Sequence, residues 1–253
     1  MNAALVHARQ VPVWGLWLVF ACVYALSLGR SFFTSDGDVM FKTTAALVEN
    51  GSLALDPDPG LPQIVPGQGG RYVSKYDPGL PLLAVPFYVT GDWIGRVNHA
   101  HRYRLAATAV QMIPVLAAAG ALAALAALAG RLFDSRRAVW ITLAAGLATA
   151  LWPYARTLFA EAVLACALTA AVWLVVRGVD SARRGWMWHL AAGVVFGGGV
   201  LTRAALGIYA LPLLVLIVRL AAGKNDHHRA LILGPVYFAL GVLPFVGLLL
   251  WFN

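Results

Sequence analysis

Two kinds of chemically capable side chain lie beside the long apolar runs of this chain, and the first is a pair of carboxylates. Asp36 and Asp38 follow the first apolar run within a few residues. A carboxylate at a membrane boundary can act as a general base that deprotonates an acceptor hydroxyl or amine, or as a metal ligand. The structural alternative is a helix N-terminus capped by Ser35, with Asp38 in the capping-box position. Because Ser35 already offers a cap, the catalytic hypothesis falls mainly on Asp36.

The second kind is a group of cations at the ends of apolar runs. Lys75 lies in the polar segment before the second run, Arg156 shares a short connection with Glu161, and Arg203 stands between two runs with almost no loop. A charged side chain at the end of a membrane span is costly to bury and often marks a functional site. An arginine there can also extend to the lipid headgroups. If these cations cluster below the acidic pair, they supply what recognition of a phosphate-bearing lipid requires.

Composition determines the class of protein in which these residues act. Of the 253 residues, 60% are hydrophobic and only 12% are charged, and the mean hydropathy is +0.75. This excludes a water-soluble globular protein, a nucleic-acid-binding arm and a disordered tail. A membrane span needs roughly 20 apolar residues. We therefore predict an all-α polytopic membrane protein with about seven transmembrane helices, at 11–28, 105–128, 138–154, 162–176, 186–201, 204–220 and 230–252.

The distribution of charge predicts the orientation of these spans. We attribute the net charge of +8 to basic loops that set the orientation of the spans, and not to a nucleic-acid-binding surface. The N-terminal segment and the connections near 131–137, 177–184 and 219–229 would lie on one side of the membrane. Together they hold ten of the nineteen Lys and Arg residues but only three of the eleven acids. The positive-inside rule then puts the N-terminus inside and the long segment 30–104 outside. We prefer an uncleaved first span to a cleaved signal peptide, because many spans follow.

The outer segment 30–104 is expected to have a structure of its own. An apolar face at helical spacing predicts a surface helix at 36–50, ended by Gly51. Short strands around the PGQGG turn predict a small hairpin from Gln63 to Val73. The apolar piece at 79–96 contains prolines and Asp92, and a crossing there would reverse the charge balance of the later loops. We interpret it as a re-entrant or juxtamembrane helix.

These segments together resemble the GT-C superfamily of membrane glycosyltransferases. The resemblance is strongest to the branch of the protein O-mannosyltransferases and the bacterial aminoarabinose lipid A transferases. It rests on a long first outer loop, a short second outer loop containing an acid, and four short motifs. The motifs are SDGD at 35–38, GRYVSKYDPGLP at 70–81, PYARTLFAE at 153–161 and LTR at 201–203.

The resemblance implies transfer of a sugar from a polyprenyl-phosphate carrier, with inversion, to a lipid, glycan or protein acceptor. The reaction would take place on the outer face of the cytoplasmic membrane. It implies that Asp36 is the base, although the family usually has Asp-Glu here, which leaves the choice between Asp36 and Asp38 open. Glu161 would be the second acid, and with Asp38 it is a candidate ligand of a divalent metal; no other cofactor is implied. The donor phosphate would be bound by Lys75, Arg156, Arg203, Tyr72 and Tyr76.

Two other functions stay open from the sequence. The first is a catalytically incomplete module that binds a lipid carrier or a partner protein. The chain stops at the end of its last apolar run, so the C-terminal part of a longer enzyme is a candidate missing piece. The second is a transporter or flippase. It is less favoured because it predicts internal repeats and charged residues at mid-span, whereas the ionisable residues of this sequence lie at the ends of the apolar runs. The sequence names neither the sugar nor the acceptor.

Overall fold

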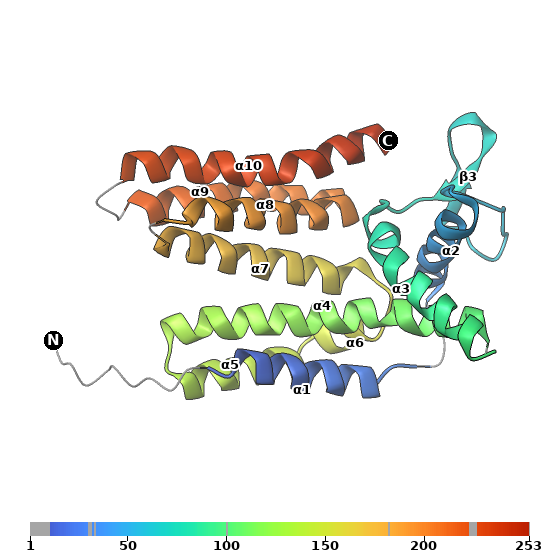
Figure 1. Ribbon diagram of the computed structural model, residues 1–253, viewed down its shortest axis with the longest axis horizontal. Coiled ribbons are helices and arrows are strands. Elements are labelled where there is room, and N and C mark those ends of the chain that lie inside the picture. The colour runs from blue at the N-terminus through green and yellow to red at the C-terminus, as the bar shows by residue number, and fades with distance from the viewer. Residues whose placement is uncertain are drawn as a thin grey trace.

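The protein is a bundle of long helices with a small mixed region at one end. The computed structural model describes residues 11–29, 32, 34–99, 101–181, 183–222 and 227–252. Seven helices run side by side along the long axis (Figure 1). They are α1 (Val13–Leu26), α4 (Arg102–Leu132), α5 (Ser135–Leu147), α7 (Ala160–Asp180), α8 (Gly185–Thr202), α9 (Ala210–Ala222) and α10 (His227–Phe252).

The predicted all-α polytopic membrane class is confirmed. Among the described residues, four stretches are long and apolar enough to cross a bilayer, and α1 is a shorter apolar helix. The four are Arg102–Leu132, Ala160–Asp180, Ala204–Ala222 and Ile232–Phe252. The third joins the 3₁₀ helix η3 (Ala204–Tyr209) to α9.

The run at 138–154, predicted as one span, is divided in the structure. Helix α5 ends at Leu147, and the short helix α6 (Leu151–Ala155) follows after a turn. Pro153 explains the division, because proline has no N–H to donate and its ring collides with the carbonyl of residue i−4 in a continuous helix. The short second outer loop therefore begins after Leu147 and not after residue 154.

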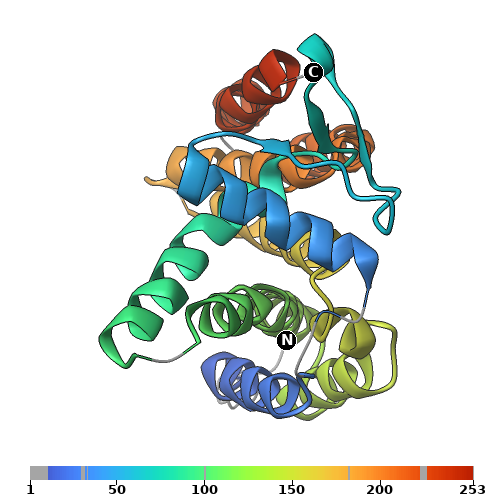
Figure 2. The same cartoon turned by 90° about the vertical axis from the view of Figure 1, so that its right-hand side faces the viewer.

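The remaining elements gather at one end of the bundle, which we call the loop end. They are α2 (Ser35–Asn50), β1 (Ala54–Leu55), β2 (Ile64–Pro66), the 3₁₀ turn η2 (Gln68–Gly70), β3 (Tyr72–Ser74) and α3 (Gly79–Val97). Viewed from this end, α2 lies across the ends of the bundle helices (Figure 2). The strands form an antiparallel sheet in the order β1-β3-β2, so the predicted hairpin gains a third strand.

The start of α2 differs from expectation in its cap. Thr34, not Ser35, is the N-cap, and its Oγ1 accepts a hydrogen bond from the Gly37 N–H at 3.2 Å. Ser35 is thereby released for another contact, described below. At the other end, Gly51 adopts the left-handed conformation with φ 63°, as predicted for the residue that ends this helix.

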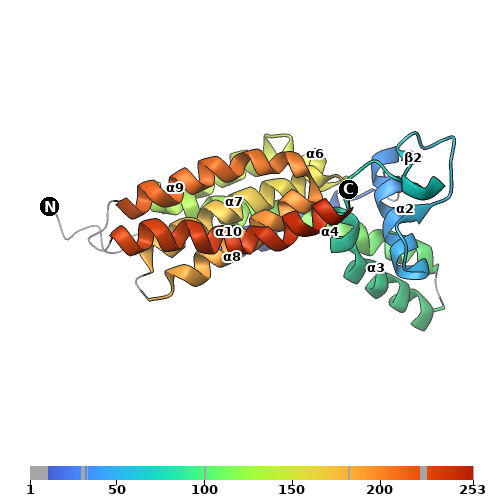
Figure 3. The ribbon, with the colours of Figure 1, turned by 90° about the horizontal axis from the view of Figure 1, so that it is seen from above.

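Small residues allow the bundle helices to pack closely. A Cβ on Gly193 would overlap the backbone of Phe238, and one on Gly241 would overlap that of Leu190, so α8 and α10 are in backbone contact. Figure 3 shows α7 to α10 as one side of the bundle. Their buried side chains form one hydrophobic cluster, whereas α1 and α4 contribute to a second.

One glycine joins the loop end to the bundle. Gly79, the first residue of α3, lies so close to α8 that a Cβ there would overlap the backbone of Leu201 and Thr202. Backbone atoms cannot move aside as a flexible side chain can. The return of the loop to the membrane is therefore held directly against the end of α8.

We expect Gly79→Ala to destabilise the protein by roughly 1–3 kcal/mol, the usual effect of overpacking a tight contact. The measurement is thermal unfolding in detergent. The matched control is Gly247→Ala in α10, where a Cβ meets nothing within 4 Å. Equal melting temperatures for the two variants would contradict the tight contact at Gly79.

Candidate active site

A cavity of about 340 Å³ at the loop end brings five of the predicted site residues together. It lies where the first turn of α2 and the segment between β3 and α3 meet the first turn of α7 and the last turn of α8. The five residues that line it are Asp36, Lys75, Tyr76, Glu161 and Arg203. Four segments far apart in the sequence thus meet at one place.

Asp36 lies in the first turn of α2, and its carboxylate is held by neighbours from the hairpin. Gln63 Nε2 donates to Asp36 Oδ1 at 2.8 Å and to Ser35 Oγ at 2.7 Å. A carboxylate in the first helical turn is also favoured by the helix dipole. The cavity therefore contains an oriented, half-buried carboxylate.

Tyr76 lies beside this carboxylate, in the segment that carries Lys75. Burial raises the pKa of the Tyr76 phenol well above its usual value, and a hydrogen bond to Asp36 raises it further. The phenol therefore stays protonated at physiological pH and keeps its donor hydrogen. Lys75 Nζ lies 5.1 Å from the centre of the Tyr76 ring, a distance at which a cation is attracted to the ring face.

Glu161 and Arg203 form an ion pair where α7 and α8 line the cavity. Glu161 is in the first turn of α7 and Arg203 is the C-cap of α8, where the chain leaves the helix in an extended conformation. Arg203 Nη1 donates to Glu161 Oε1 at 2.5 Å. Both side chains are partly exposed, so solvent weakens this pair.

The hairpin return supplies a third carboxylate, which was not singled out in the sequence. Asp77 Oδ2 accepts a hydrogen bond from the Ala204 backbone N–H at 2.8 Å. Ala204 begins η3, directly after Arg203, so this bond ties the lysine-bearing loop to the arginine-bearing turn. Asp77 lies inside the motif GRYVSKYDPGLP at 70–81, two residues after Lys75. This closeness to a candidate phosphate-binding lysine is the sequence feature that could have identified it.

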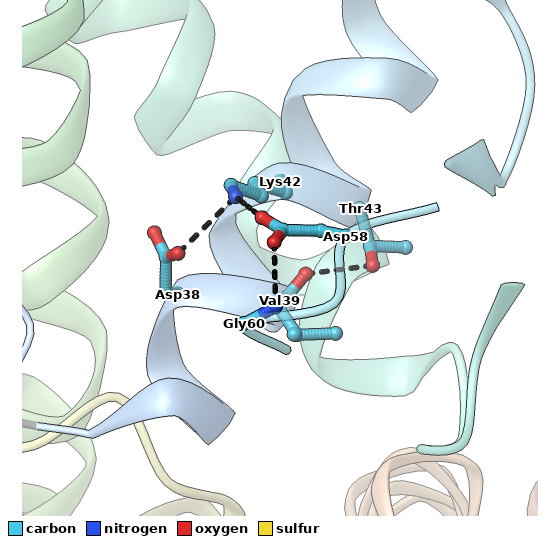
Figure 4. A network of polar contacts seen from close by, with 6 residues as sticks. All are labelled: Asp38, Val39, Lys42, Thr43, Asp58 and Gly60. Carbon is cyan, nitrogen blue, oxygen red and sulfur yellow. Dashed lines mark hydrogen bonds and ion pairs between the residues drawn. The ribbon is translucent and has the colours of Figure 1, made fainter. Parts of the chain in front are cut away.

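Asp38 lies away from this cavity. It lines a larger space of about 840 Å³ with Tyr103, Arg104 and Gln111. Its Oδ2 pairs with Lys42 Nζ at 3.4 Å, and Lys42 also donates to Asp58 Oδ2 at 3.1 Å (Figure 4). The Lys42 hydrogen bond, with one from the Gly60 N–H, lowers the pKa of Asp58. These contacts bind α2 to the loop between β1 and β2.

Tyr72 and Arg156 are also outside the cavity lining. Tyr72 is on β3 and is partly exposed, and Arg156 follows the last turn of α6. The proposed metal ligands are separated, since Asp38 and Glu161 line different cavities. Within the described ranges, no three His, Cys, Asp or Glu side chains are grouped so that they could hold a metal ion.

A carboxylate and two cations in one cavity can perform two tasks together. The cations can neutralise a phosphate, and the carboxylate can accept a proton from a nucleophile next to it. Lys75 makes no ion pair with any described carboxylate, whereas Arg203 is paired with Glu161. Lys75 is therefore the cation most available to an incoming anion.

Comparisons with known proteins identify a family and a shared fold. A family model described as dolichyl-phosphate-mannose-protein mannosyltransferase matches residues 90–251. That stretch contains Arg156, Glu161 and Arg203 and begins after Lys75. Among curated proteins, no sequence matches this chain.

Two solved structures share the fold. The crystal structure of ArnT from Cupriavidus metallidurans bound to undecaprenyl phosphate has a TM-score of 0.63 at 19% sequence identity. The apo state of the same protein has a TM-score of 0.62, also at 19% identity. In both cases 95% of this chain is covered but only 42% of the other, so this chain spans less than half the length of ArnT.

The family match covers well over half of the chain, and the fold agrees with it. The protein belongs to the dolichyl-phosphate-mannose-protein mannosyltransferase family, within the GT-C superfamily of membrane glycosyltransferases.

Proposed function

We propose that the protein transfers a sugar from a polyprenyl-phosphate carrier to an acceptor on the outer face of the cytoplasmic membrane. The observation that carries the proposal is the meeting of Asp36 with Lys75 and Arg203 in one cavity at the end of the bundle. ArnT, whose fold this chain shares, is solved with undecaprenyl phosphate bound. The family description names a dolichyl-phosphate-linked mannose.

The cavity charges suit the leaving group of this reaction. When the bond between the anomeric carbon and the phosphate oxygen breaks, the electron pair goes to the lipid phosphate. Lys75 and Arg203 would neutralise this growing charge, and preorganised cations of this kind supply a large share of catalysis. The lipid tail would remain in the bilayer beside the bundle.

Asp36 would act on the acceptor. Its carboxylate takes the proton from the acceptor hydroxyl or amine as the acceptor atom bonds to the anomeric carbon. Attack opposite to the departing phosphate inverts that carbon. The larger cavity next to α2 is lined in part by Ser35, the residue before Asp36, and its volume of about 840 Å³ would accept part of an acceptor. Asp38, with its Lys42 pair, would line the acceptor approach.

The positive-inside distribution supports the orientation in this proposal. The described parts of the Arg-rich connections, 131–137, 177–181, 183–184 and 219–222, are at the bundle end opposite to α2 and α3 (Figure 1). If that end faces the cytoplasm, the cavity with Asp36 and Lys75 faces outward. The N-terminus then lies inside.

Asp36→Asn is expected to lower transfer by about 10²- to 10⁴-fold, the usual contribution of a general base. The measurement is transfer of radiolabelled mannose from undecaprenyl-phosphate-mannose to membrane acceptors. The control is Asp56→Asn, which removes an exposed carboxylate from the same segment. Wild-type transfer by the Asp36 variant, with both variants folded, would eliminate Asp36 as the base.

Lys75→Ala is expected to lose about tenfold in affinity for undecaprenyl phosphate, because the variant loses a charge-assisted contact to the phosphate. Native mass spectrometry of the detergent-purified protein measures the bound lipid without needing turnover. Arg71→Ala removes an exposed cation from the same hairpin and is the control. Equal amounts of ordinary phospholipid in all three proteins would instead favour a module that carries no donor.

Glu161→Gln tests the ion pair with Arg203. Removing the carboxylate frees the guanidinium for the phosphate and removes a repelling charge, so affinity for undecaprenyl phosphate is expected to rise about two- to fivefold. Glu49→Gln, at the far end of α2, removes the same charge outside the cavity. Weaker binding by the Glu161 variant would show that this carboxylate is needed to hold Arg203 in place or to form part of the ligand site itself.

A further inference from the structure

Gln63 contacts the candidate site in a way that neither the motifs nor the family match identify. It lies directly before β2, and its side chain is buried, with only 7% of its surface exposed. The amide Nε2 carries two hydrogens, and both are used at the start of α2, on Ser35 Oγ and Asp36 Oδ1. Both N–H groups of the Gln63 side chain therefore donate to the first turn of α2.

The backbone of the same residue holds the cationic segment. The Gln63 carbonyl accepts a hydrogen bond from the Lys75 N–H at 2.9 Å. This bond continues the antiparallel ladder in which Ile64 pairs with Ser74. One residue therefore touches the carboxylate through its side chain and the lysine segment through its backbone.

The other half of the amide is left unsatisfied. Gln63 Oε1 is buried and has no hydrogen-bond partner among the described residues. A buried acceptor without a donor is destabilising, and an apolar side chain of similar shape would avoid this cost. The side chain is therefore poorly suited to a role in stability alone, whereas its two N–H groups are well placed to orient Asp36.

We propose that Gln63 is a positioning residue that keeps the Asp36 carboxylate aimed into the cavity and in register with Lys75. This inference rests on the proposed function, in which Asp36 is the base. Without Gln63, the Asp36 carboxylate loses this buried donor and is free to rotate out of the orientation in which it meets the acceptor.

The first test measures Asp36 itself and needs no turnover. In protein labelled with ¹³C at aspartate side-chain carboxyls, the infrared carboxylate band lost in Asp36→Asn identifies Asp36. Gln63→Leu is expected to shift this band, because the carboxylate loses an N–H donor. Thr142→Val, which removes a buried hydroxyl from α5, is the control and should leave the band in place. An unshifted band in Gln63→Leu would overturn the proposal.

The second test separates positioning from folding. With undecaprenyl-phosphate-mannose as donor, Gln63→Leu is expected to lower kcat about 10- to 100-fold, the scale of effect of a misplaced catalytic group. KM for the donor should change little, because Lys75 and Arg203 remain. A wild-type kcat in Gln63→Leu would overturn the proposal, as would a loss confined to KM.

A third variant gives a response that misfolding would not produce. Gln63→Glu places a carboxyl where the amide was, facing Asp36, with Tyr76, Lys75, Glu161 and Arg203 lining the adjoining cavity. When protonated, the new carboxyl can donate to Asp36 as the amide does; when ionised, it repels Asp36. Activity relative to wild type should therefore rise as pH falls. A constant ratio across pH would contradict the positioning role.

The outcomes distinguish this inference from the proposed function. Full transfer by Asp36→Asn would remove the proposed base, whatever Gln63 does. An inactive Asp36→Asn together with a wild-type Gln63→Leu would leave the base in place and reject only the role of Gln63.

Discussion

The site depends on a close approach between two backbones. Gly79 lies against Leu201 and Thr202, and two residues earlier Asp77 accepts a hydrogen bond from the Ala204 N–H. These contacts fix the lysine-bearing return of the loop against the place where α8 ends. A side chain at position 79 would force the segments apart. Lys75 would then lose its fixed position relative to Arg203.

Electrostatic balance within the cavity follows from this arrangement. Three carboxylates and two cations line it, which by charge alone is unfavourable for a phosphate. Each carboxylate, however, is already engaged: Asp77 by a backbone N–H, Glu161 by Arg203, and Asp36 by the Gln63 amide. The donors to Asp77 and Asp36 are neutral groups, so they stabilise these two negative charges without using up Lys75. The position of each donor therefore matters more than the net charge of the cavity.

Much of the architecture was predictable from the sequence, and the failures have physical causes. Hydropathy located the apolar helices because burial in lipid needs long apolar runs, but it overlooked Pro153, which divides the run at 138–154. Asp36 and Asp38 lie about 200° apart around a helix at 3.6 residues per turn, so a two-residue spacing already implied different faces. The role of Gln63 was not predictable, because it depends on strand register and on Thr34 taking the cap from Ser35.

The bond between Asp77 and Ala204 joins residues 127 positions apart, and this separation has a consequence for biogenesis. Membrane helices enter the bilayer in chain order during synthesis. The hairpin and α2 are therefore made well before the end of α8, to which they attach. Contacts of such long range form late and slowly, since chain entropy must be lost before they give any stabilisation. The loop end can therefore reach its final packing only after the end of α8 has been made and inserted.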